Sequence, residues 1–115
     1  MSLFDQINTK EFGGDAAVGE KHLPLLKAEK LSDGKYAIKV NVGGGKHPNE
    51  IDHWFQWVEL RINGLFVGRA EFSAKIMEPV AEFVLNLEAD KKPVISALTR
   101  CNKHGLWESS ITSKA

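Results

Sequence analysis

The chain has 115 residues, 43% of them hydrophobic and 26% charged, so it is long enough for one core but too short for two independently stable cores. Its 15 Lys and Arg residues balance 15 Asp and Glu residues, which excludes an overall field that would draw it onto nucleic acid or an anionic membrane. The single cysteine excludes a disulfide within the chain and suits a reducing compartment.

The N-terminal part of the sequence shows no sustained apolar period. Residues 1–10 lack the basic start and apolar run of a secretory signal, and no stretch approaches the length needed to span a membrane. We therefore expect a cytoplasmic protein that binds neither membrane nor nucleic acid. Residues 1–21 contain Gly13, Gly14 and Gly19, which predicts a short helical turn followed by a flexible loop.

Alternating segments begin after Leu23. Residues 36–42 place Ile38, Val40 and Val42 on one face, which is the two-residue period of a half-buried strand. Residues 54–62 repeat this alternation, and the Asn63-Gly64 pair that follows predicts a tight hairpin into residues 65–72. Further strands are predicted over residues 80–87, 94–101 and 106–112.

Short strands joined by Gly, Asn and Pro turns, without helical periodicity, are typical of an all-β protein. The pattern predicts an immunoglobulin-like antiparallel β-sandwich of about seven strands, with a barrel as the alternative. We expect a single domain over residues 1–115, in which residues 1–21 are the N-terminal segment and flexible loop and residues 22–115 are the sandwich.

The histidines and the cysteine are not scattered along the chain. They fall in three short segments, each at a predicted strand end or loop. Loops at one end of a sandwich converge, so ligands that are distant in sequence can meet around one ion. Imidazole and thiolate are ligands used for zinc, copper and iron. The candidate metal ligands are His22, His47, His53, Cys101 and His104.

Several metal sites and one non-metal site use such residues. The Cys-x-x-His spacing alone is weak evidence, because it occurs in many zinc sites and by chance. A structural zinc site takes four ligands, whereas five donors suit a larger coordination number with one open position. A blue-copper site usually adds a weak axial Met, but Met77 lies in an unrelated segment well before Cys101. A nucleophilic thiol would not need four histidines. An electron-transfer or metal-binding β-sandwich with copper or zinc, without turnover, remains the alternative.

Together, the three segments resemble the superoxide reductases of the one-iron neelaredoxin type, within the desulfoferrodoxin iron-binding domain family. The resemblance covers residues 20–108 and is specific as a combination, although no single motif is. The motifs are Glu20-Lys21-His22-Leu23-Pro24, His47-Pro48-Asn49 with His53 six residues after His47, and Cys101-Asn102-Lys103-His104-Gly105-Leu106-Trp107-Glu108.

The resemblance implies one non-haem iron with the four histidines as equatorial ligands, Cys101 as axial thiolate and the sixth position open for superoxide. It also implies that Glu20 ligates the oxidised iron and that Lys21 faces the incoming anion, which makes these two the candidate catalytic residues. An axial thiolate donates electron density and so favours electron release by the metal. A cation near the open position would help to capture superoxide in a chain of zero net charge.

The activity implied is the one-electron reduction of superoxide to hydrogen peroxide. The resemblance further implies a rubredoxin-like external electron donor and a homo-oligomer, with a tetramer favoured. Dismutation is the closest rival activity, because it requires the same site both to reduce and to oxidise superoxide. Of the aromatic residues, Trp107 is expected to fill the core or cover the site, and Trp54, Phe55 and Trp57 to pack.

Overall fold

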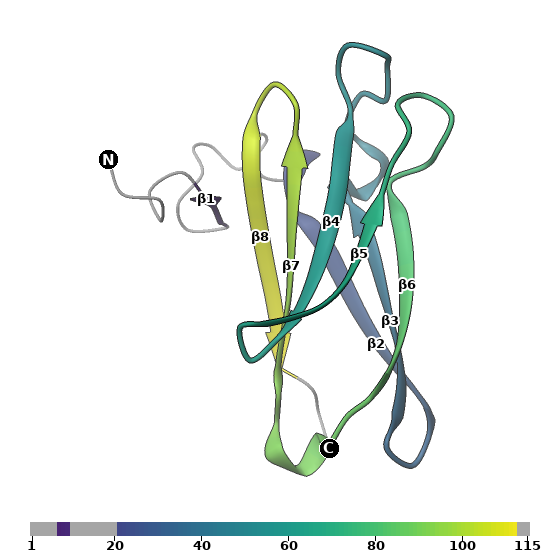
Figure 1. The fold of residues 1–115 in the computed structure, drawn as a ribbon, viewed down its shortest axis with the longest axis vertical. Coiled ribbons are helices and arrows are strands. Elements are labelled where there is room, and N and C mark those ends of the chain that lie inside the picture. Colours follow the sequence, from purple (N-terminus) through teal and green to yellow (C-terminus); the bar gives the residue numbers. More distant parts are fainter. Residues whose placement is uncertain (1–6, 10–20, 113–115) are drawn as a thin grey trace.

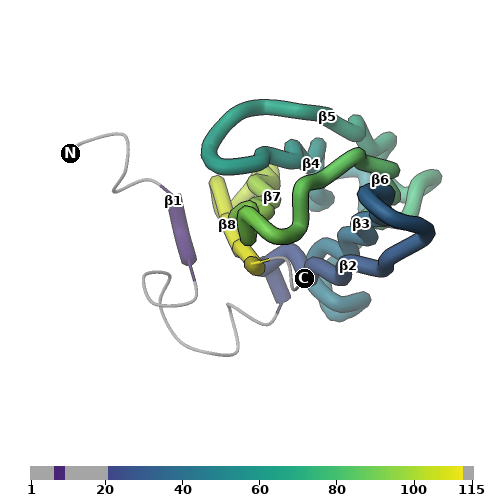
Figure 2. Tube along the Cα trace, turned by 90° about the horizontal axis from the view of Figure 1, so that it is seen from below, coloured from purple at the N-terminus to yellow at the C-terminus, as the bar shows by residue number. Residues whose placement is uncertain are grey.

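The computed structural model describes residues 7–9 and 21–112, which form two sheets packed face to face (Figures 1 and 2). The larger sheet has the strand order β1-β8-β7-β4-β5 and the smaller one β2-β3-β6. β1 pairs parallel with β8, and the other pairings are antiparallel. The strands are β1 (Ile7–Asn8), β2 (Pro24–Ser32), β3 (Lys35–Val42), β4 (Phe55–Ile62), β5 (Leu65–Glu71), β6 (Val80–Asn86), β7 (Val94–Cys101) and β8 (Gly105–Thr112), with short 3-10 helices η2 (Gly43–Gly45) and η3 (Ala89–Lys91).

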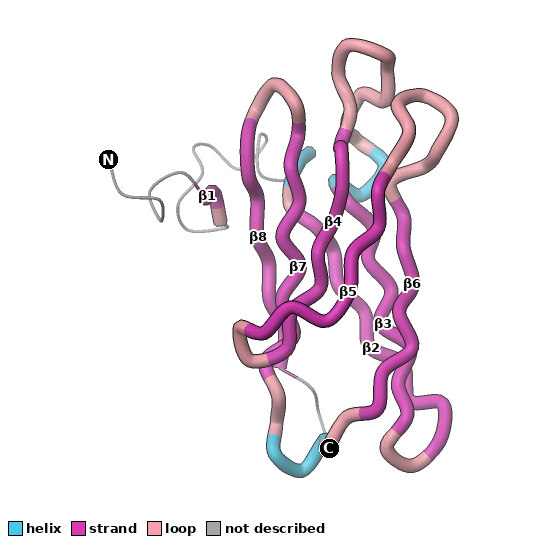
Figure 3. Tube along the Cα trace, in the orientation of Figure 1, coloured by secondary structure: helices cyan, strands magenta, loops and turns pink. Residues whose placement is uncertain are grey.

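The all-β sandwich predicted from the sequence is confirmed, and Figure 3 shows that strands dominate it. Strands β3 to β8 each begin and end within one residue of the predicted bounds. The predicted hairpin between β4 and β5 is also confirmed. Its turn residues Asn63 and Gly64 have φ of 50° and 83°, and positive φ at both central positions is the requirement of the two-residue turn that matches strand twist.

The N-terminal third departs from the prediction in two places. β2 was not predicted, because its inward face combines Leu26 with Ala28 and Lys30 while Leu25 and Leu31 are exposed, which blurs the alternation. Ile7–Asn8 form the short strand β1, which was not predicted either, whereas Lys21 and His22 are helical. The rest of the predicted turn and flexible loop, at 1–6 and 10–20, lies outside the described residues.

The core lies between the two sheets and is built from the alternating faces that the sequence predicts. Partly buried residues of β6, including Phe83 and Leu85, pack against it from the smaller sheet. Each fully buried Val, Leu or Ile side chain contributes about 1.5–3 kcal/mol relative to an exposed one. This core fixes β3 opposite β4 and β7, whose ends carry the candidate ligands. Its fully buried members are Ile38, Val40, Val42, Val58, Leu60, Ile95, Ala97 and Cys101.

One end of the sandwich collects the segments with candidate chemistry. The start of β2, the connection from β3 to β4 and the β7–β8 turn all lie at the upper end in Figures 1 and 3, whereas η3 lies at the opposite end. Among the described residues there is no helix with the length and apolar character to cross a bilayer.

Gly43 allows two of these segments to approach each other closely. Its N–H donates to the Leu23 carbonyl at 3.0 Å. A Cβ on Gly43 would lie 2.3 Å from the carbonyl oxygen of Lys21 and 3.2 Å from Cβ of His47. The triple glycine, which forms η2, therefore makes a tight turn where the backbone before β2 passes against the segment leading to His47.

Replacing Gly43 should be more damaging than replacing Gly45. Both have a left-handed φ, of 77° and 79°, so Ala costs about 1–2 kcal/mol at either position from backbone strain alone. An added Cβ meets nothing within 4 Å at Gly45 but overlaps the Lys21 carbonyl at Gly43. Denaturant unfolding should therefore show a larger loss of stability for Gly43→Ala than for Gly45→Ala, and equal losses would contradict the close approach.

Candidate metal centre

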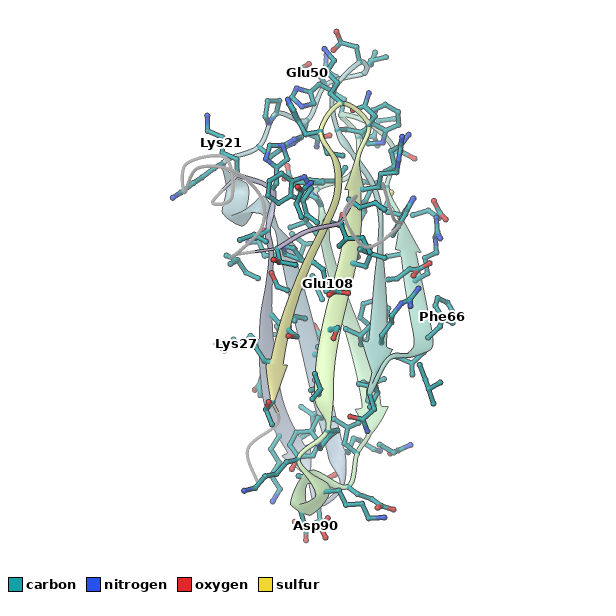
Figure 4. The ribbon with its side chains drawn as sticks, turned by 90° about the vertical axis from the view of Figure 1, so that its left-hand side faces the viewer. Lys21, Lys27, Glu50, Phe66, Asp90 and Glu108 are labelled. Carbon is teal, nitrogen blue, oxygen red and sulfur yellow. The ribbon has the colours of Figure 1, made fainter. Side chains whose placement is uncertain are left out.

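Five side chains from three separate segments meet at the upper end of the sandwich. Their candidate ligand atoms all lie within 4.8 Å of one another. The cluster lies at the end of the molecule that carries Lys21 and Glu50 in Figure 4. One histidine comes from just before β2, two from the β3–β4 connection, and a cysteine and a histidine from the end of β7 and the β7–β8 turn. They are His22, His47, His53, Cys101 and His104.

The contacts within the cluster have the spacing of ligands around one ion. His22 Nε2 lies 3.1 Å from His104 Nδ1, and His53 Nε2 lies 3.3 Å from the same atom. His47 Nε2 lies 3.2 Å from Cys101 Sγ, which is 3.6 Å from His104 Nδ1. Two ligands at right angles, each about 2.0–2.3 Å from a metal, are about 3 Å apart. The lone pairs therefore have the arrangement that a metal ion would bridge.

The nitrogen that each ring offers is set by local structure. The Nδ1–H of His47 donates to the Pro48 carbonyl at 2.6 Å, which leaves the Nε2 lone pair free for a metal. His104 faces the cluster through Nδ1, the nitrogen nearer the backbone. This is the geometry expected when Cys101 and His104, three residues apart, bind the same ion.

Aromatic packing holds two of the imidazoles. The ring of His22 stacks on Trp107 with centroids 4.7 Å apart and planes 15° apart. The ring of His47 lies against Phe55 at 4.1 Å. Trp107 is 2% exposed and donates its Nε1–H to the His104 carbonyl at 3.1 Å. Trp107 thus both fills the core and covers the site, whereas Phe55, expected only to pack, also orients a candidate ligand.

Burial favours the neutral form of two imidazoles of the metal-free site, His47 and His53. Desolvation, with a smaller contribution from the neighbouring histidines, lowers the pKa of His47 from 6.5 to about 4. The pKa of His53 is also lowered, mainly by burial and then by His104 and Lys103. A neutral imidazole is the form that binds metal. Both side chains therefore present lone pairs at neutral pH without first losing a proton.

The remaining sequence-predicted positions have different outcomes. Glu20 lies outside the described residues. Lys21 is described and exposed, and its side chain extends outward from the end of the sandwich (Figure 4). Cys101 is fully buried at the end of β7. The backbone N–H of Asn102, in the same motif, donates to the Trp54 carbonyl at 3.2 Å.

Gly43, which shapes the site, was not among the sequence-predicted residues. It lets the segment before β2 pass close to His47, and the signal for it is the triple glycine that ends two residues before that histidine. The sequence does not reveal which backbone passes beside these glycines.

Comparison with known proteins agrees with this geometry. The desulfoferrodoxin family model matches residues 15–110. The chain belongs to the desulfoferrodoxin family. A superoxide reductase of Thermococcus kodakarensis is 40% identical over 106 residues, covering 82% of this chain and 88% of that protein.

Solved structures of the family superpose on the whole sandwich. The superoxide reductase (neelaredoxin) of Ignicoccus hospitalis gives a TM-score of 0.84 at 32% identity, covering 99% of this chain and 98% of that one. The superoxide reductase (neelaredoxin) of Archaeoglobus fulgidus in the reduced form gives a TM-score of 0.76 at 31% identity, covering 96% of this chain and 99% of that one. Family membership and the five-donor cluster together identify a metal site in this desulfoferrodoxin-family chain.

Acid should destabilise the metal-free protein through His47. Because its pKa is lowered to about 4 on folding, the unfolded chain binds the proton first, and stability falls as the pH drops from about 6.5 to about 4. His47→Gln removes this titration. Denaturant unfolding of the metal-free wild type and variant should be measured across that pH range. The free energy of unfolding should fall less steeply for the variant, and parallel falls would show that His47 is not the titrating group.

Proposed function

We propose that this protein is a superoxide reductase that converts superoxide to hydrogen peroxide by one-electron reduction at a single non-haem iron. The observation that carries the proposal is the convergence of four imidazoles and one thiolate within 4.8 Å, in a chain whose relatives are named superoxide reductases. The proposed ligands are His22, His47, His53, His104 and Cys101.

The donor set fits iron better than the alternatives. Five donors exceed the four of a structural zinc site and leave one of six positions for a small anion. Cys101 is fully buried, so its sulfur can donate electron density without competition from water. When bound, the iron would supply the electron to superoxide and take one back from an external donor, for which we propose a rubredoxin-like protein.

The two residues that directly precede His22, Glu20 and Lys21, are proposed to act at the open coordination position of the iron. Lys21 directly precedes His22 and carries an exposed cation at the metal-bearing end of the sandwich (Figure 4). In a chain of zero net charge, such a local cation is the means of attracting an anionic substrate. Glu20 is proposed to ligate the oxidised iron, on the strength of its place in the first motif. The family resemblance further supports a cytoplasmic homo-oligomer, with a tetramer favoured.

Metal analysis with an activity assay tests the proposal. The protein should contain one iron per chain, show a thiolate-to-iron absorption band when oxidised, and consume superoxide with release of peroxide rather than oxygen. Cys101→Ser should abolish that band, and His47→Ala should lower iron content and superoxide consumption together. Stoichiometric copper, colourless zinc or oxygen release under a steady supply of electrons would each overturn the proposal.

Lys21 can be tested separately from the ligands. Lys21→Gln should slow the second-order reaction with superoxide about tenfold or more at low salt and flatten its salt dependence, because electrostatic steering contributes on this scale. Lys27→Gln is the matched control, since Lys27 is an exposed lysine of β2 further along the sandwich (Figure 4). Rates should be measured by pulse radiolysis at several ionic strengths, and an unchanged rate would remove Lys21 from substrate capture.

A further inference from the structure

The side chain of Asn102 connects to both sequence neighbours of His53. Its Oδ1 accepts from the backbone N–H of Trp54 at 2.9 Å, and its Nδ2 donates to the carbonyl of Asp52 at 2.8 Å. The backbone N–H of Asn102 also donates to the Trp54 carbonyl at 3.2 Å. One residue thus makes three hydrogen bonds to the two positions that flank a candidate ligand.

The backbone of His53 itself is paired within its own loop. Its N–H donates to the Glu50 carbonyl at 3.0 Å, and its carbonyl accepts from the Glu50 N–H at 2.9 Å. With the bonds from Asn102, every backbone donor and acceptor from the Asp52 carbonyl to the Trp54 carbonyl has a partner. The segment that carries this ligand is therefore fixed by hydrogen bonds along its length.

We call these hydrogen bonds to the backbone around His53 the backbone clamp. His53 depends on such support more than His22 and His47 do. His22 packs on Trp107 and His47 on Phe55. The ring of His53 lies against His47 and His104, at centroid distances of 4.6 Å and 5.0 Å, which are themselves candidate ligands. Neighbouring ligands cannot hold a ring in place before the metal arrives.

Asn102 is well placed to transmit order from the core to His53. It follows Cys101, which is fully buried at the end of β7, and precedes His104 by two residues. The same short segment therefore supplies two candidate ligands and, through an amide side chain, the support of a third. His53 Nε2 lies 3.3 Å from His104 Nδ1, so the two ends of this connection meet in the cluster.

We propose that Asn102 is a positioning residue, which holds His53 in ligating geometry by binding both its neighbours. The inference builds on the metal centre of the proposed function, but it requires only that the cluster binds a metal. Residues that orient metal ligands without touching the ion typically change metal affinity 10–100-fold when they are replaced. Loss of the Asn102 amide should have an effect of that size although all five donors remain.

Two substitutions separate the hydrogen bonds from side-chain volume. Asn102→Ala removes both side-chain bonds. Asn102→Asp has nearly the same shape and keeps the acceptor for Trp54, but it places a carboxylate oxygen against the Asp52 carbonyl. The control is Asn63→Ala, which removes a side-chain acceptor 2.9 Å from the Val94 N–H in the β4–β5 turn, away from the cluster.

The test is Co²⁺ binding to the metal-free proteins, followed by competition with a chelator and by visible spectra. Both Asn102 variants should bind Co²⁺ 10–100-fold more weakly than wild type and show altered ligand-field bands, because His53 is displaced. Asn63→Ala should lower unfolding stability and leave both readouts unchanged. Wild-type affinity and spectra in the Asn102 variants, or equal weakening in Asn63→Ala, would overturn the positioning role.

The outcome does not depend on the reaction that the centre performs. If wild type binds Co²⁺ through the thiolate but neither retains iron nor consumes superoxide, the proposed function fails and the role of Asn102 can still be read. If wild type is an active iron protein and the Asn102 variants match it in Co²⁺ affinity and spectra, only the positioning role fails.

Discussion

The whole upper end of the molecule is organised by the need to hold five electron-pair donors within 4.8 Å of one another. Without a metal, such donors gain little from proximity, because neutral imidazoles facing each other cannot all find hydrogens to share. Protonation would add repulsion, and burial opposes it, as the lowered pKa of His47 shows. The gathering must therefore be maintained by the rest of the fold until an ion binds.

Three kinds of interaction keep the donors together before a metal binds, and they act on different candidate ligands. The sandwich core fixes Cys101 as the fully buried last residue of β7. Aromatic rings hold His22 and His47 from the side. Hydrogen bonds to the backbone hold His53. The core, the aromatic packing and the hydrogen bonds thus hold candidate ligands from segments that are far apart in sequence around one point. In this way a rigid β-sandwich positions a site on its loops.

The sequence predicted the strands and the ligands well, for separate physical reasons. Strand β6, and β3 from Ile38 onward, alternate between an inward and a more exposed face, whereas β2 was missed because its two faces carry similar residues. The five candidate ligands were named from three motifs that are specific only in combination, and the structure brings their side chains together. Gly43 and the side chain of Asn102 were not, since their partners lie in other segments and a linear pattern does not show which backbones meet.

The ligands divide into a buried and an accessible set, and this division bears on how such a centre can react. Cys101 and His22 are buried, whereas His53 is partly exposed and His104 exposed. A buried thiolate keeps its electron density for the metal, because no water competes for the sulfur lone pairs. In the proposed function, the exposed imidazole side is where superoxide and the electron donor would approach. On this more accessible side, hydrogen bonds from Asn102 to the residues before and after His53 hold the ligand segment where core packing is less complete.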